Sequence, residues 1–495
     1  MQITDKRMVR KILARYLVSA TILVLLIVLV GCASYYQKPL SAQANATRFS
    51  QRSLENTGLR AFLQAQLGHP IALWPPKTWT LKQLTLLAFY YSPELALARA
   101  HWASARAESI TAGAYPNPAL QFLPKYVGNV SNMSPWTIGL SVSVPILTAG
   151  RRSYRIAEAL DQAESARLDV NQTAWHIRAN VRQVLIKLYA ARRRVVLLAA
   201  QVQDASALLN AFRQRFAAGL ASQFQVIQAR LQWTNAQLSY QAAKASESHA
   251  RTTLAGVVSV PTVVLRNLRY DFDAVQKLPV PNRLPVARFK TYALTQRPDI
   301  RAALMRYAAS QQALKLEIAR QYPNLYIGPG YQWDQGAHKW SIGFSFSLPI
   351  FNQNQGPIAQ ARAQRNKLAA QFRVLQERIT TRFNNALADY LASYHRLALM
   401  QHLLKASEAR LASVHATYQA GEASRVGLLR TKLETYGDRL ALFQARLQAE
   451  QALATLEDAL EHSLHHPTVA SRAIGKVALL LPISTHNLSA EAVSP

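Results

Sequence analysis

The hydrophobic pattern is most regular in two twelve-residue segments that nearly repeat each other. Residues 136–147 read WTIGLSVSVPIL, and residues 340–351 read WSIGFSFSLPIF; seven positions are identical, and the copies lie 204 residues apart. In both, large apolar residues alternate with small or hydroxylated ones, and a strand sends alternate side chains to opposite faces. The pattern predicts strands with one apolar and one polar face. Such strands are either half-buried in a soluble sandwich or placed between lipid and water.

The same spacing recurs at other landmarks along the chain. Ser92–Leu95 (SPEL) matches Arg297–Ile300 (RPDI) at an offset of 205 residues, and the two YPN triplets match at an offset of 207. Residues 216–222 (FAAGLAS) match residues 418–424 (YQAGEAS) at an offset of 202. Landmarks in the same order at nearly one offset predict an internally duplicated chain with two units of about 200 residues.

A long heptad pattern follows the alternating segment in each unit. Fourteen apolar residues occur at strict 4,3 spacing in the first unit: Val170, Ala174, Ile177, Val181, Val184, Leu188, Ala191, Val195, Leu198, Val202, Ala205, Leu209, Phe212 and Phe216. Eleven of the fourteen positions that lie 202 residues later, from Phe372 to Tyr418, are also apolar. An ordinary bundle core is the alternative for one stripe, but two matching stripes of this length favour coiled-coil helices of up to about 100 Å.

Each unit is predicted to have the same order of elements. A helical segment comes first, at Thr80 to Gly113 and at about 285–321, and Thr80 suits an N-cap. Two strands follow, at 119–126 and 136–144 in one unit and at 325–333 and 340–348 in the other, joined by the polar loops GNVSNMSP and DQGAHK. The long helices begin near residues 151 and 356, turn at Gly219 and Gly421, and return over about 222–257 and 424–462. The repeats therefore span 80–259 and 286–462, with an irregular linker at 260–285 and poorly patterned flanks at 32–79 and 463–495.

The first 31 residues form a separate segment. Five basic residues precede an uncharged apolar run that ends at Cys32: Lys6, Arg7, Arg10, Lys11 and Arg15. This is the pattern of a secretory signal, although a retained membrane anchor is the alternative. LVGC (29–32) also resembles a bacterial lipobox, and the resemblance implies cleavage before Cys32 and its acylation. Because Ala33 and Ser34, and not Asp, follow the cysteine, the resemblance further implies that the acylated chain is located in the outer membrane.

The composition limits which covalent links, metal sites and charged partners are possible. Cys32 is the single cysteine, so an intramolecular disulfide and a cysteine-based metal cluster are excluded. The net charge is +31; removing residues 1–31 takes away five basic residues and one acidic residue, which leaves 52 against 25 and a net charge of +27. A nucleic-acid partner would suit this charge. However, the basic residues are scattered along helical segments, and the export signal argues against nucleic acid.

The sequence contains no nucleophile–base pair, P-loop or dinucleotide fingerprint, so neither an enzyme nor a cofactor is predicted. His462, His465 and His466 have a spacing that could bind a metal at a helix end. Glu461 is the one acidic residue beside them. A solvated C-terminus is therefore the preferred interpretation, and no metal site is predicted.

The order of these features resembles the TolC-type outer-membrane efflux factors. A signal and lipobox precede a duplicated series of helix, YPN motif, strand pair, long helix, Gly-containing turn and return helix. The most specific segments are RPDIRAALMRYAASQQALKLEIARQYPNLYIGPGY (297–331), SLPIFNQNQGPIAQARAQR (347–365) and YQAGEASRVGLLRTKLE (418–434). LPIFNQNQG is similar to the heavy-metal and lipoprotein branches of that family. The resemblance covers about residues 80–460.

The resemblance implies an α+β membrane protein that assembles as a homotrimer. Four strands per chain would form a twelve-stranded β-barrel in the outer membrane, continued by a long α-helical coiled-coil barrel across the periplasm. The implied partners are outer-membrane lipid, a periplasmic adaptor and an inner-membrane transporter of the RND type. The implied function is a passive exit channel of a tripartite efflux system. Independently, a sheet with an apolar outer face and open edges requires closure by other chains in lipid.

The resemblance also assigns roles to residues. The lipid-facing strand positions would be Trp136, Ile138, Leu140, Val142, Trp340, Ile342, Phe344 and Phe346, and the lumen-facing ones Ser141, Ser143, Ser345 and Ser347. Gly219, Ser222, Gly421 and Ser424 match the family's periplasmic tip pattern, where they either dock the adaptor or only make the turn. The family often places Asp just after the tip. Here Gln225 and Gly427 occupy those positions with Arg430 nearby, which argues against an acidic selectivity ring.

Two other functions remain alternatives at this point. One is the outer-membrane channel of a type I protein secretion system, and the other is a non-conducting coiled coil that spans the envelope. A spacer needs no lumen face, so the paired amphipathic strands favour a channel. Metal ions, organic toxicants and polypeptides all remain candidate substrates.

Overall fold

A computed structural model describes residues 35–128 and 134–464 of the chain. The signal segment, Cys32, His465 and His466 lie outside the described residues. The chain divides into one unit that ends at Gln51 and a second that begins at Arg52. In the first unit, α2 (Ala42–Ser50) is a short helix whose Ala44 N–H donates to the side chain of Ser41 at 3.2 Å.

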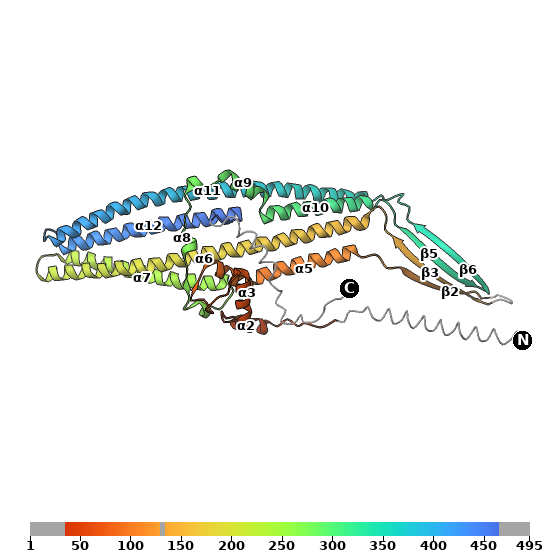
Figure 1. The fold of residues 1–495 in the computed structure, drawn as a ribbon, viewed down its shortest axis with the longest axis horizontal. Helices are drawn as coiled ribbons and strands as arrows, with labels where there is room; N and C mark the ends of the chain where they lie inside the picture. The colour runs from red at the N-terminus through yellow and green to blue at the C-terminus, as the bar shows by residue number, and fades with distance from the viewer. Residues whose placement is uncertain (1–34, 129–133, 465–495) are drawn as a thin grey trace. The chain divides into compact units, whose positions relative to one another are not determined.

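The second unit contains the duplicated series of elements (Figure 1). The first copy consists of α4 (Leu81–Tyr91), α5 (Pro93–Gly113), β2 (Ala119–Tyr126), β3 (Trp136–Ile146), α6 (Arg151–Ala217) and α7 (Gln223–Val257). The second copy consists of α9 (Val286–Thr295), α10 (Pro298–Ala319), β5 (Leu325–Asp334), β6 (Ala337–Phe346), α11 (Gln355–Gln419) and α12 (Arg425–Leu460). The predicted long helices are thus confirmed, with 67 residues in α6 and 65 in α11.

The helix predicted to start at Thr80 is interrupted once. Thr80 is its N-cap, as predicted, and forms a capping box with Gln83. The helix stops at Ser92, because Pro93 disfavours a helical conformation in the residue before it. Ser92 then caps α5, accepting a hydrogen bond from the Leu95 N–H at 3.2 Å. The second copy has the same break before Pro298.

The four long strands form one antiparallel sheet in the order β2-β3-β5-β6, so β2 and β6 are its edges. The second hairpin is tighter than the predicted loop DQGAHK. Only Gln335 and Gly336 connect β5 to β6, and both have positive φ, the requirement of the tightest hairpin turns. As a result β6 starts three residues earlier than predicted and ends at Phe346, opposite Leu325. Ser347 lies beyond the strand, and its predicted place in it is corrected.

The predicted heptad stripe is mostly buried in α6 and partly buried in α11. Eleven of the fourteen predicted positions of α6 are buried; Val195 and Val202 are half-buried, and Phe216 is exposed. All six buried residues of α11 belong to its predicted stripe: Ile379, Phe383, Ala386, Tyr390, Leu397 and Ser407. In α7 an alanine is buried at every seventh position: Ala229, Ala236, Ala243 and Ala250. These small side chains let α7 lie close against α6.

The flank before Thr80 and the linker are more ordered than predicted. They contain α3 (Thr57–Leu67), β1 (Thr78–Trp79), η1 (Thr262–Leu265), β4 (Arg269–Tyr270), α8 (Asp273–Gln276) and η2 (Pro281–Arg283). β1 and β4 pair in parallel, with Trp79 opposite Tyr270. Leu59, Leu63 and Leu265 are fully buried in one hydrophobic core with the middle of α6. Residues 57–79, although poorly patterned in sequence, are therefore ordered through burial against the rest of the unit.

Candidate functional site

One face of the sheet is apolar from edge to edge. Phe122 lies opposite Leu140, Leu140 opposite Tyr331, and Tyr331 opposite Trp340, which makes a row across all four strands. The neighbouring rows are built in the same way, with Val144, Ile327 and Phe344 in register. Trp340 is 81% exposed and Phe122 63% exposed. A contiguous exposed apolar surface of this extent marks a contact with lipid or another protein.

The opposite face carries mostly small or polar side chains, with Leu123 and Tyr326 as the large exceptions. Gln121, Ser141, Gly330 and Ser341 form a row across the four strands on this side. A Cβ atom at Gly328 would lie 2.1 Å from the backbone oxygen of Val142, so only glycine permits the two strands to approach this closely. The two faces therefore differ both in polarity and in side-chain size.

Charged side chains on the polar face gather near its turns. Lys125 lies opposite Thr137, and Thr137 lies opposite Asp334. Asp334 accepts a hydrogen bond from the Thr137 hydroxyl at 2.8 Å and pairs with the Lys339 ammonium at 2.6 Å. In the part of the sheet that the structure describes, these two lysines and one aspartate are the only charged strand residues on either face. We call Lys125, Asp334 and Lys339 the charged row.

Aromatic rings gather at the same end of the sheet, on its apolar face. The rings of Tyr126 and Trp136 lie 5.1 Å apart, and those of Tyr331 and Trp340 lie 4.8 Å apart. The Tyr331 hydroxyl and the Nδ1 atom of His338 are 2.6 Å apart. Rings with a polar edge at one end of an apolar surface are typical of a membrane–water boundary.

Arginines at the start of α6, just after the sheet, contact the ends of the shorter helices α5 and α10. Arg152 Nε donates to the Gly113 carbonyl at 2.8 Å, and Arg155 Nε donates to the Ala112 carbonyl at 2.7 Å. Arg151 instead reaches the other copy, where its Nε donates to the Ala319 carbonyl at 3.2 Å. The first turns of α6 thus satisfy free carbonyls at the ends of both α5 and α10, where positive charge is also favoured by the helix dipole.

The two predicted turns close in the same way. Gly219 and Gly421 both have positive φ, at 69° and 83°, which glycine adopts without strain. The Leu220 N–H donates to the Arg215 carbonyl at 2.7 Å, and the Glu422 N–H donates to the Thr417 carbonyl at 2.9 Å. These matching bonds end α6 and α11 in a compact reversal. We call the two turns the tips.

The serines after the tips cap the returning helices. The Ser222 hydroxyl accepts from the Gln225 N–H, and the Gln225 side chain accepts from the Ser222 N–H at 3.1 Å, which completes a capping box. Ser424 accepts from the Gly427 N–H at 3.1 Å, and Gly427 has no side chain to reciprocate. Gln225 therefore has a local structural role at the position where the resemblance leads one to expect an acid.

Arg430 lies close to the tips as well. Its guanidinium sits over the Phe212 ring, 5.3 Å from the ring centre. Phe212 is buried in a cluster that also contains Leu209, Leu429 and Leu433. Arg430 therefore holds α12 against α6 just behind the tips, in addition to any effect of its charge.

A buried ionic cluster joins α6 to α12 farther from the tips. Arg182 and Glu457 form an ion pair whose side chains are both 2% exposed, and Arg178 lies 3.9 Å from the same carboxylate. Burial lowers the pKa of Arg182 to about 9. Glu450 lies on α12 nearby, and burial raises its pKa to about 7, with Arg446 at 3.1 Å acting in the opposite direction.

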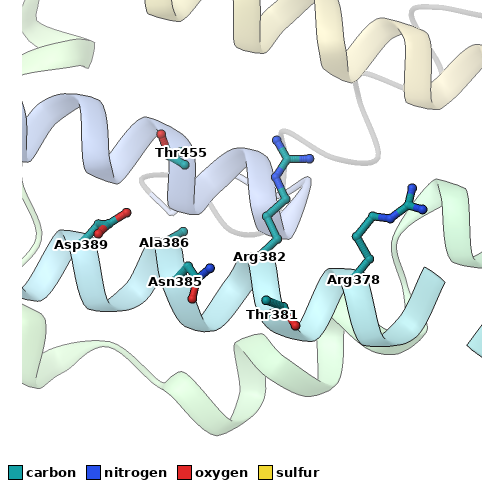
Figure 2. A pocket seen from close by; sticks show the side chains of 7 residues that line it. All are labelled: Arg378, Thr381, Arg382, Asn385, Ala386, Asp389 and Thr455. Atoms are coloured by element: carbon teal, nitrogen blue, oxygen red, sulfur yellow. The ribbon is translucent and has the colours of Figure 1, made fainter. Parts of the chain in front are cut away.

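A recess lies on the surface between α11 and α12 (Figure 2). It is lined by Arg378, Thr381, Arg382, Asn385, Ala386, Asp389 and Thr455. Arg382 points toward α12, where it pairs with Asp458. The Trp175 indole donates to the same carboxylate at 3.2 Å, so this recess borders the contact between the two copies.

The structure brings most of the sequence-predicted residues into two groups. The predicted apolar positions of β3 and β6 share one face of the sheet, and Ser141, Ser143 and Ser345 share the other. Gly219 with Ser222 and Gly421 with Ser424 form the tips. Sequence reasoning missed the charged row and the arginines that follow the sheet. Alternation within β2 and β5 could have placed Lys125 and Asp334, but Pro124 and Pro329 obscure those strands.

Solved structures of outer-membrane proteins share this fold. The outer-membrane channel OprN matches with a TM-score of 0.64 and 20% identity, covering 87% of this chain and 98% of that one. The outer membrane protein VceC from Vibrio cholerae matches with a TM-score of 0.63 and 19% identity, covering 77% and 96%. The fold that this chain shares with them is a two-faced sheet followed by long paired helices.

The chain belongs to the outer membrane efflux protein family, whose model matches residues 87–258 and 291–462. Two named relatives agree. The cobalt-zinc-cadmium resistance protein CzcC of Cupriavidus metallidurans is 27% identical over 347 residues, covering 69% of this chain and 80% of the relative. The pyoverdine export outer membrane protein OpmQ of Pseudomonas aeruginosa is 24% identical over 341 residues, covering 66% and 69%. The predicted family and the efflux-channel function are confirmed.

Proposed function

We propose that three copies of the chain close a twelve-stranded barrel in the outer membrane and a helical tunnel behind it. The apolar sheet face is then turned to lipid and the polar face to the lumen. The observation that carries this proposal is the division of the four strands into a mainly apolar and a mainly polar face. A lumen needs the polar face, and a non-conducting spacer does not.

The edges of the sheet support closure by further copies. β2 and β6 each pair on one side only, which leaves a row of backbone N–H and C=O groups on the other. Hydrocarbon offers no hydrogen bonds, so open edges are excluded there. When β6 of one chain pairs with β2 of the next, the contact is head-to-tail, and such contacts form a ring when the rotation between neighbours closes.

The helices support the same arrangement. In α12, Leu429 and Leu433 are buried in the cluster with α6. The positions 202 residues earlier, Ile227 and Leu231 of α7, are 47% and 59% exposed. The same surface is therefore buried within the chain on α12 and exposed on its counterpart α7. A neighbouring copy's α11, the counterpart of α6, fits this surface.

We further infer the surroundings of the channel. Acylation of Cys32 would anchor the chain in the outer membrane, and the tips at Gly219, Ser222, Gly421 and Ser424 would meet a periplasmic adaptor that is coupled to an inner-membrane transporter. One relative is named for cobalt-zinc-cadmium resistance and the other for pyoverdine export. Small solutes are accordingly the proposed substrates in preference to polypeptides.

The test is conductance of the purified full-length protein in planar bilayers. The wild-type trimer should give small stepwise currents. Arg430→Ala should give larger currents, because it removes the contact that holds α12 to Phe212 behind the tips. Lys290→Ala, an exposed change on α9, is the matched control and should conduct like the wild type. Well-formed trimers of both the wild type and Arg430→Ala that pass no ions would contradict the channel and favour the spacer.

A further inference from the structure

The two ends of the duplicated unit share an excess of positive charge. At the end of the sheet, the charged row holds two lysines and one aspartate. Both carboxylate oxygens of Asp334 are engaged, one by Thr137 and one by Lys339. Lys125, across Thr137 on the same face, keeps this end positive.

The tips are more strongly basic. Residues 210–230 contain Arg213, Arg215 and Arg230 and no acidic residue. Residues 412–432 contain Arg425, Arg430 and Lys432, with Glu422 as the one acid. Six basic residues against one acidic residue give a net charge of +5 per chain at the tips. The closest ion pair behind them joins Arg410 to Glu434 at 2.6 Å, just outside these windows.

We propose that the channel selects anions, and that the charged row at the outer mouth and the basic residues of the tips set this selectivity. The inference rests on the proposed function, since it places the polar face of three sheets around one lumen. It names the substrate class as anionic solutes, including anionic complexes of metals or organic acids.

The physical reason is the concentration of like charge where the passage begins and ends. Each of three copies would contribute two lysines and one aspartate to the outer mouth and a net charge of +5 to the inner entrance. Rings of basic side chains favour anions in pores, and a cleft lined by one sign of charge raises the local concentration of the opposite ion. Salt screens such fields, with a Debye length of about 30 Å at 0.01 M and about 3 Å at 1 M.

The experiment is the reversal potential of the purified full-length trimer in a KCl gradient across a planar bilayer. In dilute KCl the wild type should be more permeable to chloride than to potassium. Lys125→Gln with Lys339→Gln removes the mouth charges, and Arg213→Gln with Arg425→Gln removes part of the tip charge. Combining the four should lower the chloride-to-potassium permeability ratio by about threefold or more.

Controls separate charge from structure. Asp334→Asn should raise the ratio, because it removes the one acid of the charged row. Lys290→Gln, a change of the same kind on α9 away from both ends, should leave the ratio unchanged. The preference of the wild type should vanish in about 1 M KCl, whereas a purely steric effect would persist.

The outcomes are distinct. A preference for potassium in the wild type, or a ratio that the four substitutions do not lower, overturns anion selection while leaving the channel intact. Trimers without any current, including Arg430→Ala trimers, overturn the proposed channel itself. A shift produced by one pair alone supports the proposal and assigns the selectivity to that end.

Discussion

Phe344 and Ser345 are adjacent in the chain and belong to opposite faces of the sheet. Phe344 lies opposite Ile327 and Ser345 opposite Tyr326. With the faces assigned as proposed, a cation at Phe344 would enter lipid, and one at Ser345 would enter water. The two positions differ by a single residue, so they make a closely matched pair.

We predict that Phe344→Arg blocks assembly and that Ser345→Arg does not. A basic residue on the lipid face of a barrel costs about 2–4 kcal/mol near the midplane. The measurement is the fraction of trimer in outer-membrane extracts by gel mobility, followed by conductance of the Ser345→Arg trimer, which should differ from the wild type. Equal tolerance of the two substitutions would refute the assignment of faces.

Glu450 makes stability depend on pH. It is fully buried on α12, and burial raises its pKa to about 7 in the folded chain. An unfolded glutamate has a pKa of about 4.3, so the folded state binds the proton more tightly. Its stabilising contribution is present below about pH 4.3 and is lost as the pH rises through about 7.

We predict that Glu450→Gln flattens this dependence. The wild type should unfold at lower temperature at pH 8 than at pH 5.5, and the difference should be smaller in the variant, since glutamine cannot lose a proton. Circular dichroism of the helices in detergent measures the midpoints. Glu434→Gln, an exposed change on the same helix, is the control. Identical slopes in Glu450→Gln and the wild type would exclude this role.

At the scale of elements, α7 has two different sides. Ala236 is buried where α7 lies close to α6, while Leu238, two residues later, is 64% exposed. The alanine side fixes the distance between the helices within one chain. The leucine side continues the exposed stripe of Ile227 and Leu231, whose counterparts in α12 are buried, while Leu440, the counterpart of Leu238 itself, is half-buried.

We predict opposite effects of changing the two sides. Ala236→Leu should destabilise the folded chain by about 1–3 kcal/mol, because the close-packed contact has no room for extra methyl groups. Leu238→Ala should leave the fold of one chain unchanged and weaken the trimer. Chemical denaturation and analytical ultracentrifugation in detergent separate the two effects. A trimer that survives dilution as well in Leu238→Ala as in the wild type would contradict the second part.

Most of these elements could be predicted from the sequence, because their signals are local or periodic. The heptads of α6 and α11 repeat over many turns, and Thr80, Ser222 and Ser424 have the caps expected of their residue types. The turn between β5 and β6 was predicted too long, since Gln335 rarely adopts positive φ. The order of α3 depends on burial against distant parts of the chain, which no local pattern reveals.

The candidate site could be predicted only in part for a similar reason. Strand alternation gave the two faces of β3 and β6 directly. The charged row depends on register, because Lys125 and Asp334 are 209 residues apart and meet across Thr137 only once β3 pairs with both β2 and β5. Likewise, the sequence contains Arg151 but no sign that it reaches the end of α10.

At the scale of the whole molecule, the duplication is expected to give two equivalent helix contacts that alternate, one within each chain and one between neighbouring chains. α12 of the second repeat covers α6 of the first, and in the proposed trimer the corresponding contact, from α7 to α11, would be made with a neighbouring chain. Leu433 shares a buried cluster with Leu209. The position 202 residues before Leu433 is Leu231, and the position 202 residues after Leu209 is Leu411. These two leucines are therefore the expected pair between neighbouring chains.

We predict that Leu231→Cys combined with Leu411→Cys forms disulfides between copies. Oxidation should give covalent dimers and trimers that dithiothreitol reverses. Each single substitution should give neither, and Leu231→Cys with Leu399→Cys, an exposed position on another part of α11, is the control for chance collision. The measurement is non-reducing gel electrophoresis of membranes. Crosslinking only within one chain would contradict the alternating arrangement.

The open edges of β2 and β6 also govern the order of events when the protein is made. A single newly exported chain has unpaired backbone groups at two strand edges and an exposed apolar face. Water does not favour the apolar face, and hydrocarbon does not satisfy the backbone groups. A single chain is therefore expected to be stable neither in water nor in the lipid bilayer. In the proposed trimeric barrel, insertion would therefore wait until three chains have met, and we expect the amount of assembled channel to rise more steeply than in proportion to synthesis.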